Sequence, residues 1–114
     1  MANPSKAKGT RFEVQCANFL REAGYTEVYR MATQSEHDCG DLGGLPLFAV
    51  ECRDRQKIDL AKNVDDANKR AANKEVPYGV TMMKRRNKNI ADAYVAMDLK
   101  TFVAILDALQ QTAK

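Results

Sequence analysis

The sequence predicts an α/β domain in which helices flank a mixed central sheet, and three observations lead to this fold class. Apolar residues recur at helical spacing in three separate segments. Between these segments lie short runs of aromatic and β-branched residues, which are typical of strands. The chain has 114 residues, enough for one domain, and no repeat or linker divides it. Three helical faces need a sheet to cover, so the expected order of elements is αβββαββα.

The first half of the chain is expected to hold one helix and three strands, after a flexible tail over residues 1–7. The helix is predicted by one apolar stripe, and Gly24 supplies its end. Residues 25–31 predict a strand, followed by a polar stretch over 32–40. Leu42 and residues 47–52 lie on either side of two glycines and predict a β-hairpin. The stripe of the helix consists of Phe12, Cys16, Phe19, Leu20 and Ala23.

The second half is expected to hold two helices and two strands. Asp59 is well placed as an N-cap for a helix whose small alanines would let it lie close to a sheet. Residues 78–83 and 94–97 predict strands, separated by a basic loop, and Asp98 can cap the last helix. The buried stripes are expected to be Leu60, Val64, Ala67 and Ala71 in the first of these helices, and Leu99, Phe102, Val103, Leu106 and Leu109 in the last.

Composition excludes several classes of protein. The 18 Lys and Arg residues outnumber the 15 acids, and the pI of 8.8 is compatible with a polyanionic partner. No apolar run is long enough for a transmembrane helix, and the polar start lacks the core of a signal peptide. The three cysteines are irregularly spaced, which argues against a disulfide framework and against structural zinc. We therefore expect an intracellular, cytoplasmic protein with reduced thiols.

Candidate chemistry concentrates on the predicted hairpin. Asp41 opens it, and Glu51 lies near the end of its second strand. Carboxylates on neighbouring strands can converge on a hard cation such as Mg²⁺. Side chains alternate along a strand, so Glu51 and Arg53 share one face, roughly 6.6 Å apart. A metal-binding carboxylate beside a permanent cation suits the hydrolysis of a phosphodiester. The alternative, which spacing alone leaves open, is a surface hairpin whose charges face water.

These residues resemble a known family. Over residues 8–106 the chain is similar to the PD-(D/E)XK, or restriction-endonuclease-like, nucleases, and especially to the small archaeal-type and phage Holliday-junction resolvases. Lys8-Gly9-Thr10-Arg11-Phe12-Glu13 resembles the opening motif of that family, and Gly24-Tyr25 with Arg30 resembles its turn and strand-end arginine. Gly40-Asp41-Leu42 and Val50-Glu51-Cys52-Arg53 resemble its catalytic motif, with Ser35 in the loop ahead of it.

The resemblance implies a single nuclease domain with a restriction-endonuclease-like core. It implies that Asp41, Glu51 and the Cys52 carbonyl ligate Mg²⁺ or Mn²⁺, with Glu13 in contact directly or through water. It also implies a homodimer that cuts four-way or other branched DNA. Residues expected to contact DNA are Lys8, Arg11, Arg30, Ser35, Lys84, Arg85, Arg86 and Lys88.

Arg53 departs from the family motif, which has lysine at this position. Arginine stays charged at any working pH, so it cannot accept a proton. It can still orient water and stabilise the charge that develops on phosphorus. Asp66 lies where relatives often carry glutamine, and it is given no role, while His37 is expected to be a bystander in a polar loop. Three functions remain open: an endonuclease, an inactive DNA-binding module of the same fold, and an unrelated interaction protein.

Overall fold

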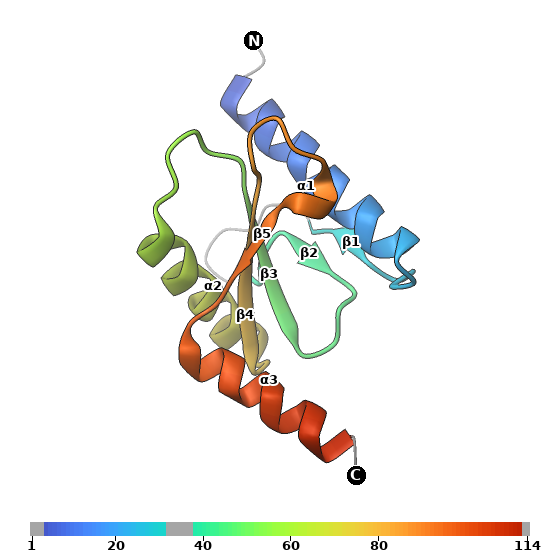
Figure 1. Cartoon of the computed structure of the whole chain (residues 1–114), viewed down its shortest axis with the longest axis vertical. Helices are drawn as coiled ribbons and strands as arrows, with labels where there is room; N and C mark the ends of the chain where they lie inside the picture. Colours follow the sequence, from blue (N-terminus) through green and yellow to red (C-terminus); the bar gives the residue numbers. More distant parts are fainter. Residues whose placement is uncertain (1–3, 32–37, 113–114) are drawn as a thin grey trace.

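The computed structural model describes residues 4–31 and 38–112, which form three α-helices and one five-stranded sheet (Figure 1). The helices are α1 (Pro4–Glu22), α2 (Leu60–Lys74) and α3 (Leu99–Thr112). The strands are β1 (Tyr29–Arg30), β2 (Leu42–Gly43), β3 (Phe48–Arg53), β4 (Tyr78–Met83) and β5 (Tyr94–Ala96), and a short 3₁₀ turn, η1 (Ile90–Asp92), precedes β5. The α/β class and the expected element order are confirmed.

The sheet is mixed, and its strands lie in chain order. The pairs β1–β2, β2–β3 and β4–β5 are antiparallel, whereas β3 and β4 are parallel, with Glu51 opposite Thr81. A parallel pair needs a long crossover connection, which here contains α2. The two longest strands, β3 and β4, are neighbours inside the sheet, and α2 packs against both of them.

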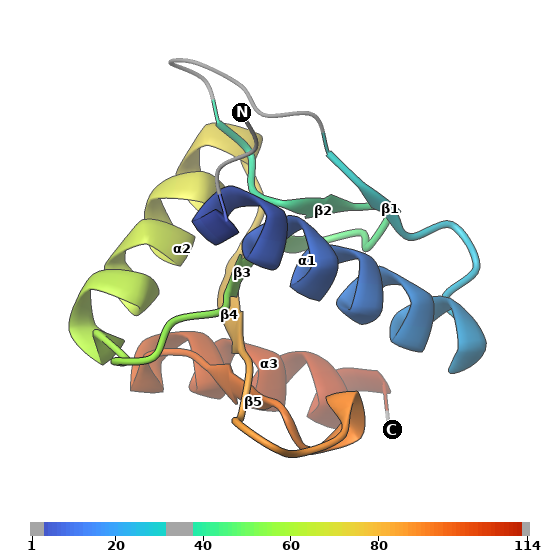
Figure 2. The same cartoon turned by 90° about the horizontal axis from the view of Figure 1, so that it is seen from above.

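Helices α1 and α2 lie on opposite sides of β3 (Figure 2). On the α1 side, Phe12 and Cys16 pack in one buried cluster with Val50, Cys52 and other residues of the sheet. On the α2 side Ala67 and Ala71 are buried, and a Cβ atom on Gly79 of β4 would clash with the backbone oxygen of Ala67. The prediction that small residues allow close packing of this helix is confirmed.

The face of α3 that packs against the protein is a correction to the sequence analysis. The predicted buried stripe is exposed, by between 39% for Leu106 and 74% for Leu99. The buried residue of α3 is instead Thr101, which lies on the opposite side of the helix at 3.6 residues per turn. The apolar periodicity correctly predicted a helix. It has the same form whether the apolar stripe packs on the sheet of its own chain or is left exposed, so it could not predict which face is buried.

Smaller differences concern the ends and the edges of elements. Helix α1 begins at Pro4, inside the stretch expected to be a tail, and β1 covers only two residues of the strand expected over 25–31. Leu60 is 55% exposed and Phe19 is 40% exposed, so each lies outside the buried part of its predicted stripe. Leu60 is the first residue of α2 and Phe19 lies in the last turn of α1, so both side chains are at the end of a helix whose middle packs on the sheet.

Other local predictions are confirmed. The Asp59 carboxylate accepts a hydrogen bond from the backbone N–H of Lys62, and that of Asp98 accepts one from Thr101, so both residues are N-caps. The three cysteines form no disulfide, and Cys16 and Cys52 are in the core. In the part of the chain that the structure describes, no helix is long and apolar enough to cross a membrane.

Candidate active site

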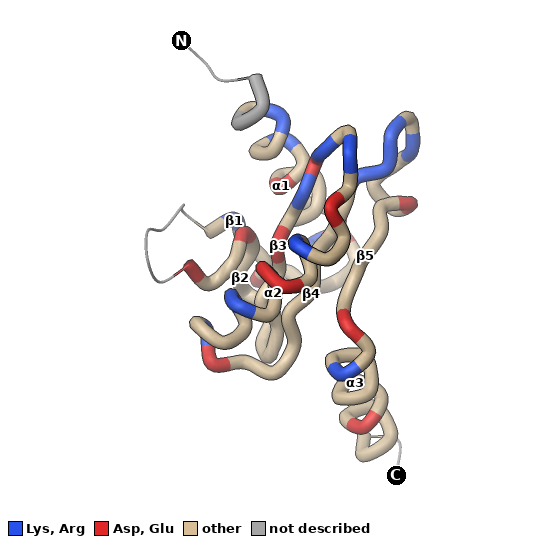
Figure 3. Tube along the Cα trace, turned by 90° about the vertical axis from the view of Figure 1, so that its left-hand side faces the viewer, with Lys and Arg blue, Asp and Glu red and all other residues tan. Residues whose placement is uncertain are grey.

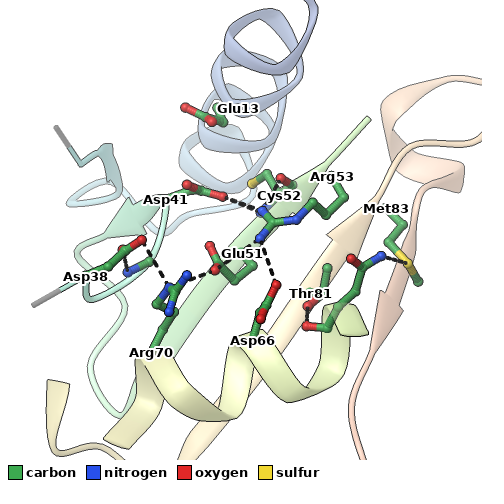
Figure 4. Close-up of polar contacts among 12 residues, drawn as sticks. Glu13, Asp38, Asp41, Glu51, Cys52, Arg53, Asp66, Arg70, Thr81 and Met83 are labelled. Atoms are coloured by element: carbon green, nitrogen blue, oxygen red, sulfur yellow. Dashed lines mark hydrogen bonds and ion pairs between the residues drawn. The ribbon is translucent and has the colours of Figure 1, made fainter. Parts of the chain in front are cut away.

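Strand β3 carries Glu51 and Arg53 on the face that α2 covers (Figure 4). Glu51 is only 1% exposed, which is unusual for a carboxylate. Its Oε1 atom lies 3.3 Å from Nη2 of Arg53, so the shared face predicted from strand alternation is confirmed. The opposite face of β3 carries the apolar side chains that pack on α1.

Asp41 is held against β3 by backbone contacts. Its N–H donates a hydrogen bond to the Val50 carbonyl over 2.7 Å, and its Oδ2 accepts one from the N–H of Cys52 over 2.7 Å. Gly40 makes this approach possible, since it has a φ of 112° and a Cβ atom there would lie 2.8 Å from the Val50 oxygen. The tight turn therefore fixes the Asp41 carboxylate beside the end of β3.

The guanidinium of Arg53 contacts all three oxygens that the sequence singled out as metal ligands. Its Nη1 donates hydrogen bonds to the Cys52 carbonyl oxygen over 2.9 Å and to Asp41 Oδ2 over 3.2 Å, and its Nη2 donates one to Glu51 Oε1 over 3.3 Å. Oxygens from two side chains and one backbone carbonyl thus converge on a single cationic group.

Helix α2 adds two charged residues that the sequence analysis did not assign to the site. Arg70 Nε lies 3.1 Å from Glu51 Oε1 and 3.0 Å from Asp38 Oδ2, although its N–H is not directed to form a hydrogen bond with either oxygen. Asp66 Oδ2 lies 3.7 Å from Arg53 Nη2 and 2.9 Å from Lys62 Nζ. A sequence signal for them was available: Lys62, Asp66 and Arg70 follow one another at four-residue spacing, which puts them on one face of α2, next to the stripe of alanines.

Glu13 lies at the margin of this cluster, on α1. Its Oε1 accepts hydrogen bonds from Arg30 Nε over 3.1 Å and Nη2 over 3.0 Å. Figure 4 shows Glu13 apart from the contacts between Arg53 and Glu51. Arg30, expected at the DNA surface, therefore pairs with a candidate catalytic residue in this structure.

Burial and mutual repulsion favour the protonated form of two carboxyl groups. Burial, followed by the charge of Asp41, raises the pKa of Glu51 to about 7 and outweighs the two guanidinium groups beside it. The same two causes raise the pKa of Glu13, while Arg30 lowers it. Burial acts to lower the pKa of Arg53, but Glu51 and Asp41 raise it above its usual value. The site thus holds more negative charge than its arginines neutralise.

The donor atoms fit a hard divalent cation in kind, because carboxylate and carbonyl oxygens are the ligands of Mg²⁺ and Mn²⁺. In this structure, however, these oxygens are arranged around the Arg53 guanidinium, to which all three accept hydrogen bonds. Among residues 4–31 and 38–112, no group of three or more Asp, Glu, His or Cys side chains is arranged to hold a metal ion. A metal ion held by Asp41, Glu51 and the Cys52 carbonyl would take the point that the Arg53 guanidinium now contacts.

Basic side chains flank this site. Lys8 of α1 and Lys84, which follows β4, both face Asp54, at 3.6 Å and 3.9 Å. The Lys and Arg segments at the start of α1, after β3 and after β4 lie toward the same end of the molecule, away from α3 (Figure 3). Arg11, Arg86 and Lys88 are exposed, and Arg85 stacks over the Tyr94 ring at 4.9 Å. Ser35 and His37 lie outside the described residues.

Comparison of the chain with protein-family models, with curated proteins and with solved structures finds no match. The resemblance to PD-(D/E)XK nucleases therefore depends on the motifs in the sequence and on the order of the elements.

Proposed function

We propose that this protein is a Mg²⁺- or Mn²⁺-dependent endonuclease of the restriction-endonuclease-like type, and that it cuts branched DNA such as four-way junctions. The observation that carries the proposal is the convergence of Asp41 Oδ2, Glu51 Oε1 and the Cys52 carbonyl oxygen on one cation, here the Arg53 guanidinium. The element order αβββαββα agrees with this type of core.

Asp41, Glu51 and the Cys52 carbonyl would hold the metal ion, and Glu13 would act from the margin. A bound Mg²⁺ polarises a phosphoryl oxygen and lowers the pKa of a bound water. The raised pKa values of Glu51 and Glu13 support a cation site, since a divalent cation would relieve the repulsion between these carboxylates and Asp41.

The arginines of the site then have two tasks. Arg53, released from the carboxylates, would donate hydrogen bonds to the phosphate and stabilise its developing charge. Arg70 would stay beside Glu51 and keep this buried carboxylate oriented, because Asp38 fixes Arg70 from the other side. In this proposal Arg53 is a catalytic residue and Arg70 is a positioning residue.

The substrate is proposed from charge and from the resemblance. Lys8 and Lys84 face Asp54, which follows Arg53, and the basic loop after β4 lies toward the same end of the molecule. These cations are proposed to contact phosphates on either side of the cut. Cutting a four-way junction into two duplexes requires two symmetric incisions, and the chain offers one candidate site. A resolvase of this size therefore needs two copies related by a twofold axis.

The exposed stripe of α3 supports a homodimer. Five apolar side chains point away from Thr101, which packs on the protein, and a second copy is proposed to cover them. The exposed side chains of β5, Tyr94 and Val95, lie on the edge strand of the same sheet. The stripe consists of Leu99, Phe102, Val103, Leu106 and Leu109.

The deciding experiment incubates the purified protein with labelled four-way junction, flap and linear duplex DNA, with and without Mg²⁺. We expect Mg²⁺-dependent, paired incisions in the junction and little cleavage of the duplex. Binding without cleavage, with every DNA and with either Mg²⁺ or Mn²⁺, would favour the second candidate, an inactive DNA-binding module. The specific observation in favour of that candidate is the guanidinium that already donates hydrogen bonds to the three ligand oxygens.

A further inference from the structure

A pocket of about 390 Å³ lies between α1 and the segment that joins β4 to β5. Its volume falls in the range of about 300–1,000 Å³ that is usual for ligand sites. Three cations line it: Lys84, Arg85 and Lys88. From the sequence these residues were expected to contact DNA as charges on a loop. In the structure they also form walls of a cavity.

The other walls of the pocket are not those of a simple phosphate site. Gln15 and Asn89 offer amide groups, which can donate and accept hydrogen bonds with the edge of a base. Ile90 and Ala93, which are partly exposed, supply apolar surface that can contact the flat face of a base, with the buried Phe12 behind them. Cations, amides and apolar atoms together match the three parts of a nucleotide: its phosphate, the edge of its base and the face of its base.

The pocket lies on the α1 side of the sheet, and Lys84 connects it to the end of β3, where the candidate active site lies on the other face. Phe12 immediately precedes Glu13 on α1. The backbone N–H of Lys84 donates a hydrogen bond over 3.0 Å to the carbonyl oxygen of Arg53, and the side chains of Lys84 and Lys8 face Asp54. A DNA strand whose phosphate lies at the carboxylates would reach the pocket by passing over the end of β3 beside Lys84.

We infer that this pocket binds an unpaired nucleotide of the DNA strand that passes the active site. This inference rests on the proposed nuclease function and deepens it. A base within a duplex faces its partner and is stacked between neighbours, so it cannot enter a concave site without leaving the helix. At an open branch point a nucleotide lacks a stacked neighbour on one side, so it can leave the helix at a lower cost. Selection of branched DNA would then reside in Gln15, Asn89 and the apolar walls, while the cations give general affinity.

The test measures binding in EDTA, so that no cleavage occurs, by fluorescence anisotropy with a labelled single-stranded oligonucleotide and a blunt-ended linear duplex. The double variant Gln15→Ala/Asn89→Ala should lose about 10-fold in affinity for the single strand and keep its affinity for the duplex. Ala93→Trp, which fills the pocket, should have the same selective effect. Lys88→Gln should weaken both complexes and lower their salt dependence.

The matched control is Gln111→Ala on α3, which removes an amide outside both the pocket and the apolar stripe and should change neither affinity. Equal losses for both DNAs, or no loss with either pocket variant, would overturn the inference. Its failure is distinct from failure of the proposed function, since binding is measured without metal. If the wild-type protein cuts junctions but both pocket variants bind DNA normally, the proposed role of the pocket is wrong and the proposed nuclease function stands.

Discussion

Arg53 Nη2 lies 3.3 Å from Glu51 Oε1, two residues away on the same face of β3. Glu51 is buried and Arg53 is partly exposed, so the pair extends from the interior to the surface of the site. A buried carboxylate without a cation would be costly, and in this structure Arg53 and Arg70 supply the positive charge. Removal of either arginine or either carboxylate therefore changes the charge balance of the whole site.

Asp41→Ala and Glu51→Ala should each abolish Mg²⁺-dependent cleavage and leave junction binding largely intact. Each change removes an oxygen ligand of the proposed metal site and no phosphate contact. The measurement is a cleavage time course alongside a gel-shift titration. Asp65→Ala, which removes an exposed carboxylate from α2, is the control and should cut normally. A variant of Asp41 or Glu51 that cuts at the wild-type rate would exclude the proposed metal site.

Arg53→Ala should lower the single-turnover cleavage rate by about 100- to 1,000-fold, the usual effect of losing one charged donor to a developing oxyanion. Arg53→Lys should retain most of the rate, because it keeps a positive charge on the same face. An unchanged rate in Arg53→Ala would assign the stabilisation of the phosphate to another cation, with Lys84 and Lys57 the first to test.

Removing the Arg53 guanidinium should also strengthen metal binding. The guanidinium contacts the same three oxygens that a metal ion needs, so the two cations compete. We expect Arg53→Ala to bind Mn²⁺ more tightly than the wild type, by about 10-fold or more. The measurement is a titration followed by the paramagnetic signal of free Mn²⁺, with Arg55→Ala as the control. Weaker binding of Mn²⁺ to Arg53→Ala would contradict the idea that the guanidinium and the metal ion compete for these oxygens.

Stability of the metal-free protein should fall as the pH rises from about 4.5 to 7. Burial and then Asp41 raise the pKa of Glu51 from 4.5 in the unfolded chain to about 7, so the folded state binds this proton more tightly. The contribution is fully present below pH 4.5 and lost as the pH passes 7, a change of about 3 kcal/mol.

Denaturant unfolding at several pH values checks this prediction, with Glu51→Gln as the comparison. The variant cannot ionise at this position, so its stability should decline less over the same range. Millimolar Mg²⁺ should reduce the decline in the wild type, because a bound cation favours the ionised carboxylate. If the free energy of unfolding changed with pH in the same way for both metal-free proteins, the pKa of Glu51 would not be raised in the folded state, and the prediction would be wrong.

Leu106→Glu should convert the proposed homodimer to a monomer without a loss of thermal stability. Leu106 is 39% exposed in the isolated chain and belongs to the stripe that faces away from the sheet. Sedimentation equilibrium at micromolar concentration measures the mass, and Gln111→Glu, a new charge on another side of α3, is the control. A wild-type protein that is monomeric both free and on a junction would exclude the resolvase and leave a nicking or single-strand nuclease.

The sequence by itself determined the elements and several of their ends. Periodicities of 3.6 and 2 are properties of local chain geometry, so they predicted three helices and the strands in order. Caps at Asp59 and Asp98 depend on neighbours within three residues and were predicted for the same reason. Alternation along β3 likewise put Glu51 and Arg53 on one face.

Only the tertiary structure decided which faces meet. The apolar stripe of α3 has the same period whether it covers its own sheet or is left exposed, and here Thr101 packs inward instead. Arg70 and Asp66 join the site because α2 crosses β3, at a separation in sequence that no local pattern reports. The contact of Arg53 with Asp41 depends on the turn at Gly40, which brings β2 against β3. Long-range packing, and not local propensity, therefore set the charge balance of the candidate site.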